Sequence, residues 1–307
     1  MGKTINSYYG ILGDKKTAVI EMATACGLDL LTPEEKNPLE CSTYGFGQLI
    51  LDAINKGISS FILGLGGSAT NDAGIGMLQA LGVKFLDKDK NEIGFGAKYI
   101  QDISYIDTHL LDKRLFDIKF KVACDVTNIL CGKEGASHVF GPQKGATASM
   151  VEHLDTSLYN FALLCEKTFD RKTKIIKGCG AAGGLGFGLI TFLNASLLSG
   201  IDIVLNKVQL DEHIKDADLV ITGEGKMDAQ TAKGKVPTGV ARRAKRYDVN
   251  VIAICGAVEE GYEEVYKHGI DAVFDTTPGV ASLNEVLKNA KNNIKTTSQN
   301  IARLLKL

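Results

Sequence analysis

The chain has 307 residues, of which 45% are hydrophobic and 23% charged, and its formal net charge is -1. This composition is typical of globular proteins, and the length allows two hydrophobic cores. The nearly neutral charge gives no electrostatic footprint for nucleic acid or for an anionic membrane. No apolar run reaches the ~18 residues of a membrane span. Seven scattered cysteines without metal-site spacing indicate reduced thiols in a cytoplasmic protein.

The first elements predicted along the chain are a strand, a helix and a second strand. Lys16–Leu28 reads as a buried strand followed by a turn, and Tyr44–Ile58 carries its apolar residues on one helical face. Ser60–Leu63 then looks like the end of another buried strand. A run of glycines follows this strand directly, so the connection to the next element is the first candidate for a ligand site.

Three glycines, Gly64, Gly66 and Gly67, lie between this strand and a helix predicted to begin near Ala73. Glycine lets a ligand approach the main chain closely, and free amides at a helix N-terminus attract anions. The alternative is a tight turn that needs glycine for packing only. Short polar side chains follow in greater number than one helix cap requires, which favours a ligand: Ser68, Thr70, Asn71 and Asp72.

The middle of the chain continues the alternation of strands and helices. Phe116–Val126 alternates apolar and polar residues from its first residue, which predicts a half-buried strand that ends at Asp125. Ligands of parallel sheets meet the protein at such strand ends. Val151–Phe169 predicts an amphipathic helix, and Gly178–Ala195 predicts a glycine-rich turn that leads into an apolar helix.

The last hundred residues repeat this order more plainly. The sequence predicts strands at Asp218–Thr222, Val249–Gly256 and Val273–Phe274, and helices at Pro237–Tyr247 and Leu283–Leu307. Strands that alternate with helices indicate an α/β protein with a parallel sheet. We place a domain boundary near Gly200.

Further polar residues fall near strand ends. Lys144 lies between glycines in GPQKGAT (141–147), where a lysine can reach a phosphate; the alternative is a solvated surface lysine. Glu224, Asp228 and Gln230 are expected to project from a glycine-bearing loop after the strand that ends at Thr222. Each acid alone is better explained by a helix cap or a solvated turn.

Two stretches also fit the spacing of a dinucleotide-binding fingerprint, and this leaves an NAD-linked oxidoreductase as an alternative. Gly64, Gly66 and Ala69 match the first, with Asp87 about 20 residues on where a ribose-binding acid should lie. The second comprises Gly178, Gly180 and Gly183. Asp87 also opens a charged DKDKNE turn, whose simpler interpretation is a solvated loop. No Walker motif occurs.

Long stretches of the chain resemble the type I glycerate kinases, which phosphorylate D-glycerate with ATP. The matching stretches, in the family's order, are YGIL (9–12), TAVIEMA (17–23), TYGFGQLI (43–50), GLGGSATNDAGIGMLQALG (64–82), VACDVTNILCG (122–132), GASHVFGPQKGA (135–146), GCGAAGGLGFGL (178–189) and ITGEGKMDAQTAKGKVPTGVARRAK (221–245). They span nearly the whole chain, and GGSATND and TGEG-x-x-D-x-Q are long and specific.

The resemblance implies an enzyme with two α/β domains and an active site in the cleft between them. Residues 1–200 would be an inserted α/β domain, and residues 201–307 the C-terminal part of a Rossmann-like parallel-sheet domain. The family normally begins with a further segment that carries DSFKGS-like and DGGEGT-like loops, which this sequence lacks. A sheet without those strands would expose an edge and an apolar face, so a homo-oligomer is an expectation. A shortened product, a second polypeptide or a loss of activity would each account for the difference.

The resemblance also implies roles for the residues around phosphate and metal. Gly66, Gly67, Ser68 and Thr70 would bind the phosphates of ATP, and Lys144 would neutralise their charge. Asp72 or Asp228 would take the hydroxyl proton or hold Mg²⁺, and the choice between them stays open.

The remaining polar residues would bind the substrate. Asn71, Glu224 and Gln230 would orient hydroxyls of glycerate or ribose, and Asp125 suits a metal ion or a substrate hydroxyl. Lys226, Lys233 or Lys235 would meet the glycerate carboxylate.

The sequence therefore predicts ATP-dependent phosphorylation of D-glycerate, with ATP and Mg²⁺ as cofactors. An inactive or truncated homologue that binds a ligand or partner is the first alternative, and the NAD-linked enzyme is a distant second.

Overall fold

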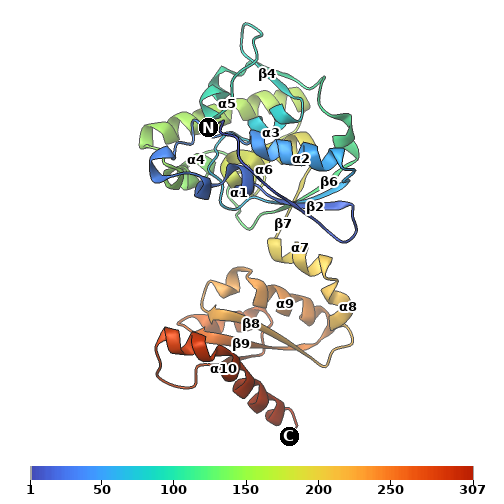
Figure 1. The fold of residues 1–307 in the computed structure, drawn as a ribbon, viewed down its shortest axis with the longest axis vertical. Helices are drawn as coiled ribbons and strands as arrows, with labels where there is room; N and C mark the ends of the chain where they lie inside the picture. The colour runs from blue at the N-terminus through green and yellow to red at the C-terminus, as the bar shows by residue number, and fades with distance from the viewer. Residues whose placement is uncertain (1, 307) are drawn as a thin grey trace. The chain divides into compact units, whose positions relative to one another are not determined.

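The computed structural model describes residues 2–306, apart from the side chain of Lys233. Its internal contacts divide the chain into two compact units, Met1–Gly200 (unit 1) and Ile201–Leu307 (unit 2), each built from strands and helices (Figure 1). The α/β class predicted from the sequence is confirmed. Among the described residues, no helix combines the length and the apolarity that a membrane crossing demands.

Unit 1 contains seven strands and six α-helices among its described residues. The strands are β1 (Gly10–Ile11), β2 (Thr17–Glu21), β3 (Ser60–Gly64), β4 (Lys84–Leu86), β5 (Tyr105–Asp107), β6 (Lys119–Ala123) and β7 (Ser196–Leu198). The helices are α1 (Ala23–Cys26), α2 (Tyr44–Asn55), α3 (Ile75–Ala80), α4 (Ala136–Phe140), α5 (Ala148–Phe169) and α6 (Ala181–Leu193). Short 3₁₀ helices are η1 (Leu28–Leu30), η2 (Pro33–Glu35), η3 (Ala97–Asp102), η4 (Lys113–Asp117) and η5 (Pro142–Lys144).

The main sheet of unit 1 has the strand order β1-β2-β3-β6-β7, and its last four strands are parallel. Ile20, Leu63 and Val122 are in register on neighbouring strands and are fully buried in one core with residues of α2, α3, α5 and α6. The parallel strands place their carboxyl ends at one edge of the sheet. The glycine-rich loop follows β3 at this edge.

One predicted strand of unit 1 begins later than the sequence pattern indicated. Phe116 alternates with the apolar residues of β6, but it lies in η4 and its side chain is 73% exposed. The carboxylate of Asp112 accepts hydrogen bonds from the backbone and side chain of Arg114 and holds this segment in a turn. β6 therefore starts only at Lys119.

Unit 2 contains a parallel sheet with the order β10-β9-β8. Its strands are β8 (Leu219–Met227), β9 (Asn250–Val258) and β10 (Ala272–Asp275), its α-helices are α8 (Leu210–Ile214), α9 (Val236–Ala244) and α10 (Leu283–Leu304), and α7 (Gly200–Lys207) leads into it. Its 3₁₀ helices are η6 (Thr231–Lys233), η7 (Lys245–Tyr247) and η8 (Tyr262–His268). Leu307, the predicted end of the last helix, lies outside the described residues.

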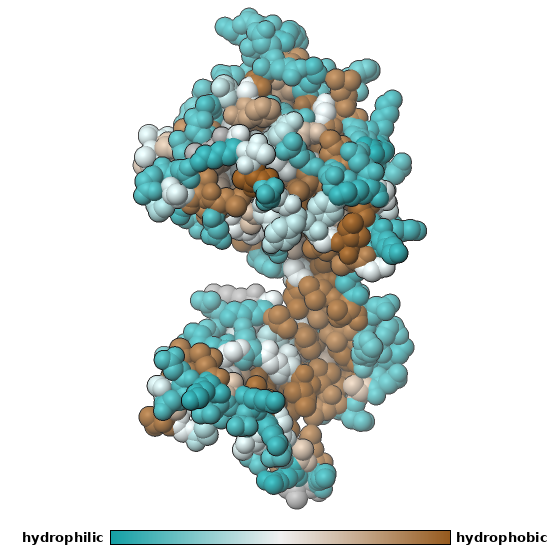
Figure 2. Space-filling view, viewed as in Figure 1, coloured by the Kyte–Doolittle hydropathy of each residue, from teal (hydrophilic) through white to brown (hydrophobic). Residues whose placement is uncertain are grey.

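The strand predicted to end at Thr222 continues to Met227, which corrects the expected loop at Glu224. The extension occurs because β8 pairs with β9 from Leu219 to Met227, and Glu224 lies opposite Cys255. Figure 2 shows apolar side chains gathered on the surface of unit 2, and four of its valine and isoleucine residues are about half exposed: Val204, Val208, Ile221 and Val236.

Candidate phosphate-binding site

The glycine-rich loop presents unpaired main-chain amides to solvent. Gly66 and Gly67 are exposed, and no hydrogen bond from either backbone nitrogen is formed within residues 2–306. The loop is held against residues 26–28, since the Leu28 amide donates to the Gly67 carbonyl (2.8 Å) and the Ala69 amide donates to the Cys26 carbonyl (2.9 Å). Turns that present successive free amides in this way commonly bind anions.

The helix after the loop does not offer its N-terminus to a ligand, which corrects the sequence prediction. α3 begins at Ile75, and the amides of Gly74 and Gly76 are buried and donate to the carboxylate of Asp72 (3.2 and 3.3 Å). The same carboxylate accepts from the Thr43 amide (2.8 Å) and hydroxyl (2.9 Å). Asp72 therefore joins the start of α2 to the start of α3.

Asp72 is only 1% exposed, and burial raises the pKa of its carboxyl despite the hydrogen bonds from Thr43, Gly74 and Gly76. A carboxylate surrounded by these donors has little room for a metal ion or for a substrate proton. The geometry therefore favours a positioning role for Asp72.

Lys144 is buried beneath the loop and is 2% exposed, so it is not the solvated surface lysine of the alternative interpretation. Its Nζ donates to the Ser68 hydroxyl (2.8 Å) and to the Thr70 carbonyl (2.7 Å). Burial lowers its pKa to about 7, although the negative charge of Asp72 favours the protonated form. The Lys144 amino group thus fixes the loop from its inner side.

Two buried polar atoms next to this lysine have no hydrogen-bond partner among the described residues. They are the Thr70 hydroxyl and the side-chain carbonyl of Asn71, whose amide group donates to the Ser137 hydroxyl (2.9 Å). Unpaired buried polar atoms are costly, and where they persist they often meet a ligand or water. The loop therefore retains hydrogen-bonding capacity on its buried side.

Two carboxylates lie at the same edge of the sheet as the glycine loop. Asp125 follows β6, is exposed, and accepts a hydrogen bond from the Gly200 amide (3.0 Å). Glu21 ends β2 opposite Gly64, and its Cγ would lie 3.5 Å from a Cβ placed on that glycine. Asp125 was recognisable from the sequence, whereas Glu21 was not, because an exposed glutamate at a strand end has no distinctive pattern.

In unit 2 the structure brings together Glu224 and Asp228. The Thr231 hydroxyl donates to Glu224 (3.1 Å), and the Lys235 ammonium lies 3.3 Å from Glu224 and 3.8 Å from Asp228. The backbone amide of Gln230 donates to the Asp228 carboxylate (2.9 Å), and the residue itself is exposed. The sequence analysis missed Thr231, although a threonine three residues after an aspartate is a common turn pattern.

The charge of Asp228 is favoured by its surroundings. Burial opposes its ionisation, but the Gln230 amide and the ammonium groups of Lys226 and Lys235 outweigh it and lower the pKa. Lys226 also pairs with Glu259 (2.9 Å), so both described candidate cations are already neutralised. The side chain of Lys233, the third candidate, lies outside the described residues.

The carboxylates of Glu224 and Asp228 offer the oxygen ligands that Mg²⁺ prefers. Within the described part of the chain, no group of three or more His, Cys, Asp or Glu side chains is arranged to hold a metal ion by itself. Asp228 alone thus fits a Mg²⁺ ion that takes its other ligands from water and from phosphate oxygens, as is usual for this metal.

Neither dinucleotide fingerprint has the context that it requires. Asp87 lies in the turn between β4 and β5, where it accepts from the amides of Asp89 (2.8 Å) and Asn91 (2.9 Å). Its carboxylate shapes a hairpin, as the simpler interpretation held. The glycines from Gly178 to Gly183 follow α5 and not a strand. The structure gives no support to an NAD site.

The fold and the loop define an α/β protein with an exposed glycine-rich turn at the carboxyl edge of a parallel sheet. Comparison with known proteins then identifies the family. The model of the glycerate kinase family matches residues 1–306, and the chain belongs to this family.

The relatives are similar over nearly the whole chain. A glycerate kinase of Haemophilus influenzae is 50% identical over 99% of this chain and 81% of its own length. The Escherichia coli protein named glycerate 2-kinase is 48% identical over 99% of this chain and 80% of its own length. The crystal structure titled as putative glycerate kinase 2 from Salmonella typhimurium LT2 superposes with a TM-score of 0.87 at 46% identity, over 98% of this chain and 79% of that chain.

Proposed function

We propose that the chain transfers the γ-phosphoryl group of ATP to a hydroxyl of D-glycerate. The observation that carries the proposal is the pair of exposed, unpaired amides at Gly66 and Gly67, on a loop fixed by the buried ammonium of Lys144. The relatives named as glycerate kinases support the choice of substrate. All seven cysteines are free thiols, which supports a reducing compartment such as the cytoplasm.

In this proposal the loop binds and orients the phosphates of ATP. Phosphoryl transfer needs mainly alignment and neutralisation of charge, with little covalent chemistry by the protein. The main chain from Gly66 to Ser68 supplies donors, and Lys144 acts as a positioning residue because its Nζ is occupied by Ser68 and Thr70. Asn71 supports the same loop through Ser137.

The acidic residues divide by their surroundings. A carboxylate with a lowered pKa is a weak proton acceptor but a good ligand for a cation, so Asp228 is assigned to Mg²⁺ rather than to the proton. Mg²⁺, when bound, neutralises the charge that develops on the transferred group. Glu224, Gln230 and Asp125 are assigned to hydroxyls of glycerate or ribose, since each keeps polar atoms in partly or fully exposed positions.

A coupled assay of ADP release with D-glycerate tests this function. Enolase in the coupling mixture accepts 2-phosphoglycerate directly, whereas 3-phosphoglycerate requires an added mutase, so the product isomer is read in the same experiment. We expect release that depends on both Mg-ATP and D-glycerate. The assay is run on the chain alone and on the chain with an added N-terminal segment of a relative. If calorimetry shows that Mg-ATP binds but neither mixture releases ADP, the result would favour an inactive ligand-binding homologue.

A further inference from the structure

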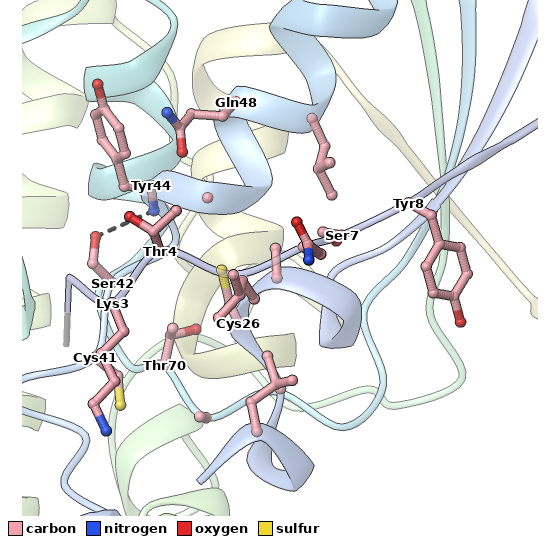
Figure 3. A pocket seen from close by; sticks show the side chains of 18 of the residues that line it. Lys3, Thr4, Ser7, Tyr8, Cys26, Cys41, Ser42, Tyr44, Gln48 and Thr70 are labelled. Carbon is pink, nitrogen blue, oxygen red and sulfur yellow. Dashed lines mark hydrogen bonds between the residues drawn. The ribbon is translucent and has the colours of Figure 1, made fainter.

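Unit 1 contains a cavity of about 1000 Å³ next to the glycine-rich loop. Its walls include the N-terminal segment 2–9, the end of α1, one face of α2 along its whole length, and Ala69 and Thr70 of the loop (Figure 3). Pockets for nucleotide-sized ligands have volumes of roughly 300–1,000 Å³. A three-carbon acid would leave most of this space empty, so the volume suits a larger ligand.

The lining is largely uncharged. Tyr44 contributes a ring that packs edge-on against Phe95, with 4.7 Å between ring centroids. Gln48 lies one turn further along α2, and Figure 3 shows its side chain beside that of Tyr44. Aromatic and aliphatic walls with a few amide and hydroxyl groups are typical of sites for a flat heterocycle and a sugar.

The charged residues of the lining already have partners. Lys56 pairs with Asp52, which also accepts from the Tyr9 hydroxyl (2.7 Å for both), and Lys3 pairs with Glu35. No unpaired ammonium of the described lining therefore faces the cavity. A polyphosphate would find little neutralising charge there, whereas an uncharged nucleoside would meet no penalty.

The cavity and the exposed amides share one wall. Cys26 and Gly27 line the cavity, and the Gly67 and Ala69 main chain is hydrogen-bonded to residues 26 and 28. The loop thus runs from the exposed Gly66 and Gly67 to Thr70 at the cavity. Gly67 and Thr70 are three residues apart, so their Cα atoms are separated by at most about 10 Å, which is within the reach from a ribose to its terminal phosphate.

Thr70 adds an observation that points to a ligand. It lines the cavity and is 1% exposed, yet its hydroxyl has no partner within the described residues. Figure 3 shows the side chain between those of Cys26 and Cys41. A buried hydroxyl without a partner is destabilising. The hydroxyl is shielded from the cavity in this structure, and a rotation of the side chain toward the cavity would bring it to a polar ligand group.

We propose that this cavity binds the adenosine part of ATP, with the phosphates at the amides of Gly66 and Gly67. The assignment rests on the proposed kinase function and adds the position of the nucleoside to it. Tyr44 and Phe95 then face the base, and the Thr70 hydroxyl meets a hydroxyl of the sugar once its side chain rotates toward the cavity.

A tryptophan placed at the cavity tests the assignment, because the protein contains no tryptophan. Gln48 is an exposed helical residue of the lining, so Gln48→Trp introduces a single reporter with little risk to the fold. Phe116→Trp is the control, since Phe116 is exposed and does not line the cavity. Each variant is titrated with ATP, with ADP and with inorganic tripolyphosphate, and binding is measured in parallel by calorimetry.

We expect ATP and ADP to change the emission of Gln48→Trp saturably, tripolyphosphate to leave it unchanged, and Phe116→Trp to respond to none of them. Thr70→Val, which replaces the hydroxyl by a methyl group, should lower the affinity for ATP about 2- to 10-fold and leave the affinity for tripolyphosphate unchanged. Two results would overturn the assignment of the cavity and leave the kinase proposal standing. In the first, calorimetry shows that ATP binds to Gln48→Trp but the tryptophan emission does not change. In the second, tripolyphosphate changes the emission as much as ATP does. No ATP binding by the parent chain would overturn the kinase proposal with it.

Discussion

Replacement of Lys144 by methionine is the most informative single change, because the lysine is the buried support of the glycine loop. Methionine keeps much of the volume and removes the ammonium. The Ser68 hydroxyl and the Thr70 carbonyl then lose a donor at 2.8 and 2.7 Å. Each buried acceptor without a partner costs about 1–3 kcal/mol. We expect the loosened loop to bind Mg-ATP about tenfold more weakly.

The pH dependence of stability gives a sharper signature than the stability itself. Burial lowers the Lys144 pKa from its ordinary 10.5 to about 7 in the folded chain. Between these two values the unfolded chain binds more protons than the folded chain, so the free energy of unfolding rises with pH. The full difference corresponds to roughly 5 kcal/mol, or at most about 1.4 kcal/mol for each pH unit. This rise is absent without the lysine.

Urea unfolding of the parent and of Lys144→Met at several pH values between about 7 and 9.5 measures the effect. The parent should become progressively more stable relative to the variant as the pH rises. Lys167→Met serves as the control, since Lys167 is an exposed lysine of α5, and its curve should run parallel to that of the parent. Parallel curves for Lys144→Met as well would show that Lys144 titrates as a solvated lysine, and would refute its assigned role.

Three other substitutions separate structural from functional residues. Asp72→Asn should lower the free energy of unfolding by about 2–4 kcal/mol in urea, because a buried acceptor of four hydrogen bonds is altered; a fall in kcat with unchanged stability would instead make it catalytic. Asp228→Asn should lower kcat about 10²-fold and shift the midpoint of the Mg²⁺ dependence, and unaltered turnover would remove it from the mechanism. Gly67→Ala should lower the free energy of unfolding by about 1 kcal/mol, because Gly67 has a φ of +71° and its added Cβ would lie 3.3 Å from that of Ala23. Gly66→Ala is the matched control, because a Cβ added there would meet open space. Equal stability of the two variants would contradict the loop geometry.

The sequence could predict most strands and helices because their hydrophobic periodicity reflects one buried face. Strand β3 and helix α5 lie where this pattern places them. Hydrophobic periodicity did not predict the element boundaries where strand pairing or a turn determined them. β8 extends past Thr222 because β9 offers a partner along its whole length, and Phe116 continues an alternation in sequence without belonging to the sheet.

The candidate site divides in the same way. The glycines of the loop were recognisable from their spacing and from the resemblance to a family. The burial of Lys144 was not, because it depends on how η5 packs beneath a loop some 70 residues earlier in the chain. Likewise the hydrogen bonds between Asp72 and Thr43 join residues 29 positions apart, and no local pattern announces them.

The most direct measurement is a crystal structure of the chain with Mg²⁺ and a non-hydrolysable ATP analogue. The account predicts phosphate oxygens within about 2.7–3.2 Å of the backbone nitrogens of Gly66 and Gly67, above the Lys144 ammonium. Phosphates bound elsewhere, with both amides left to solvent, would contradict it.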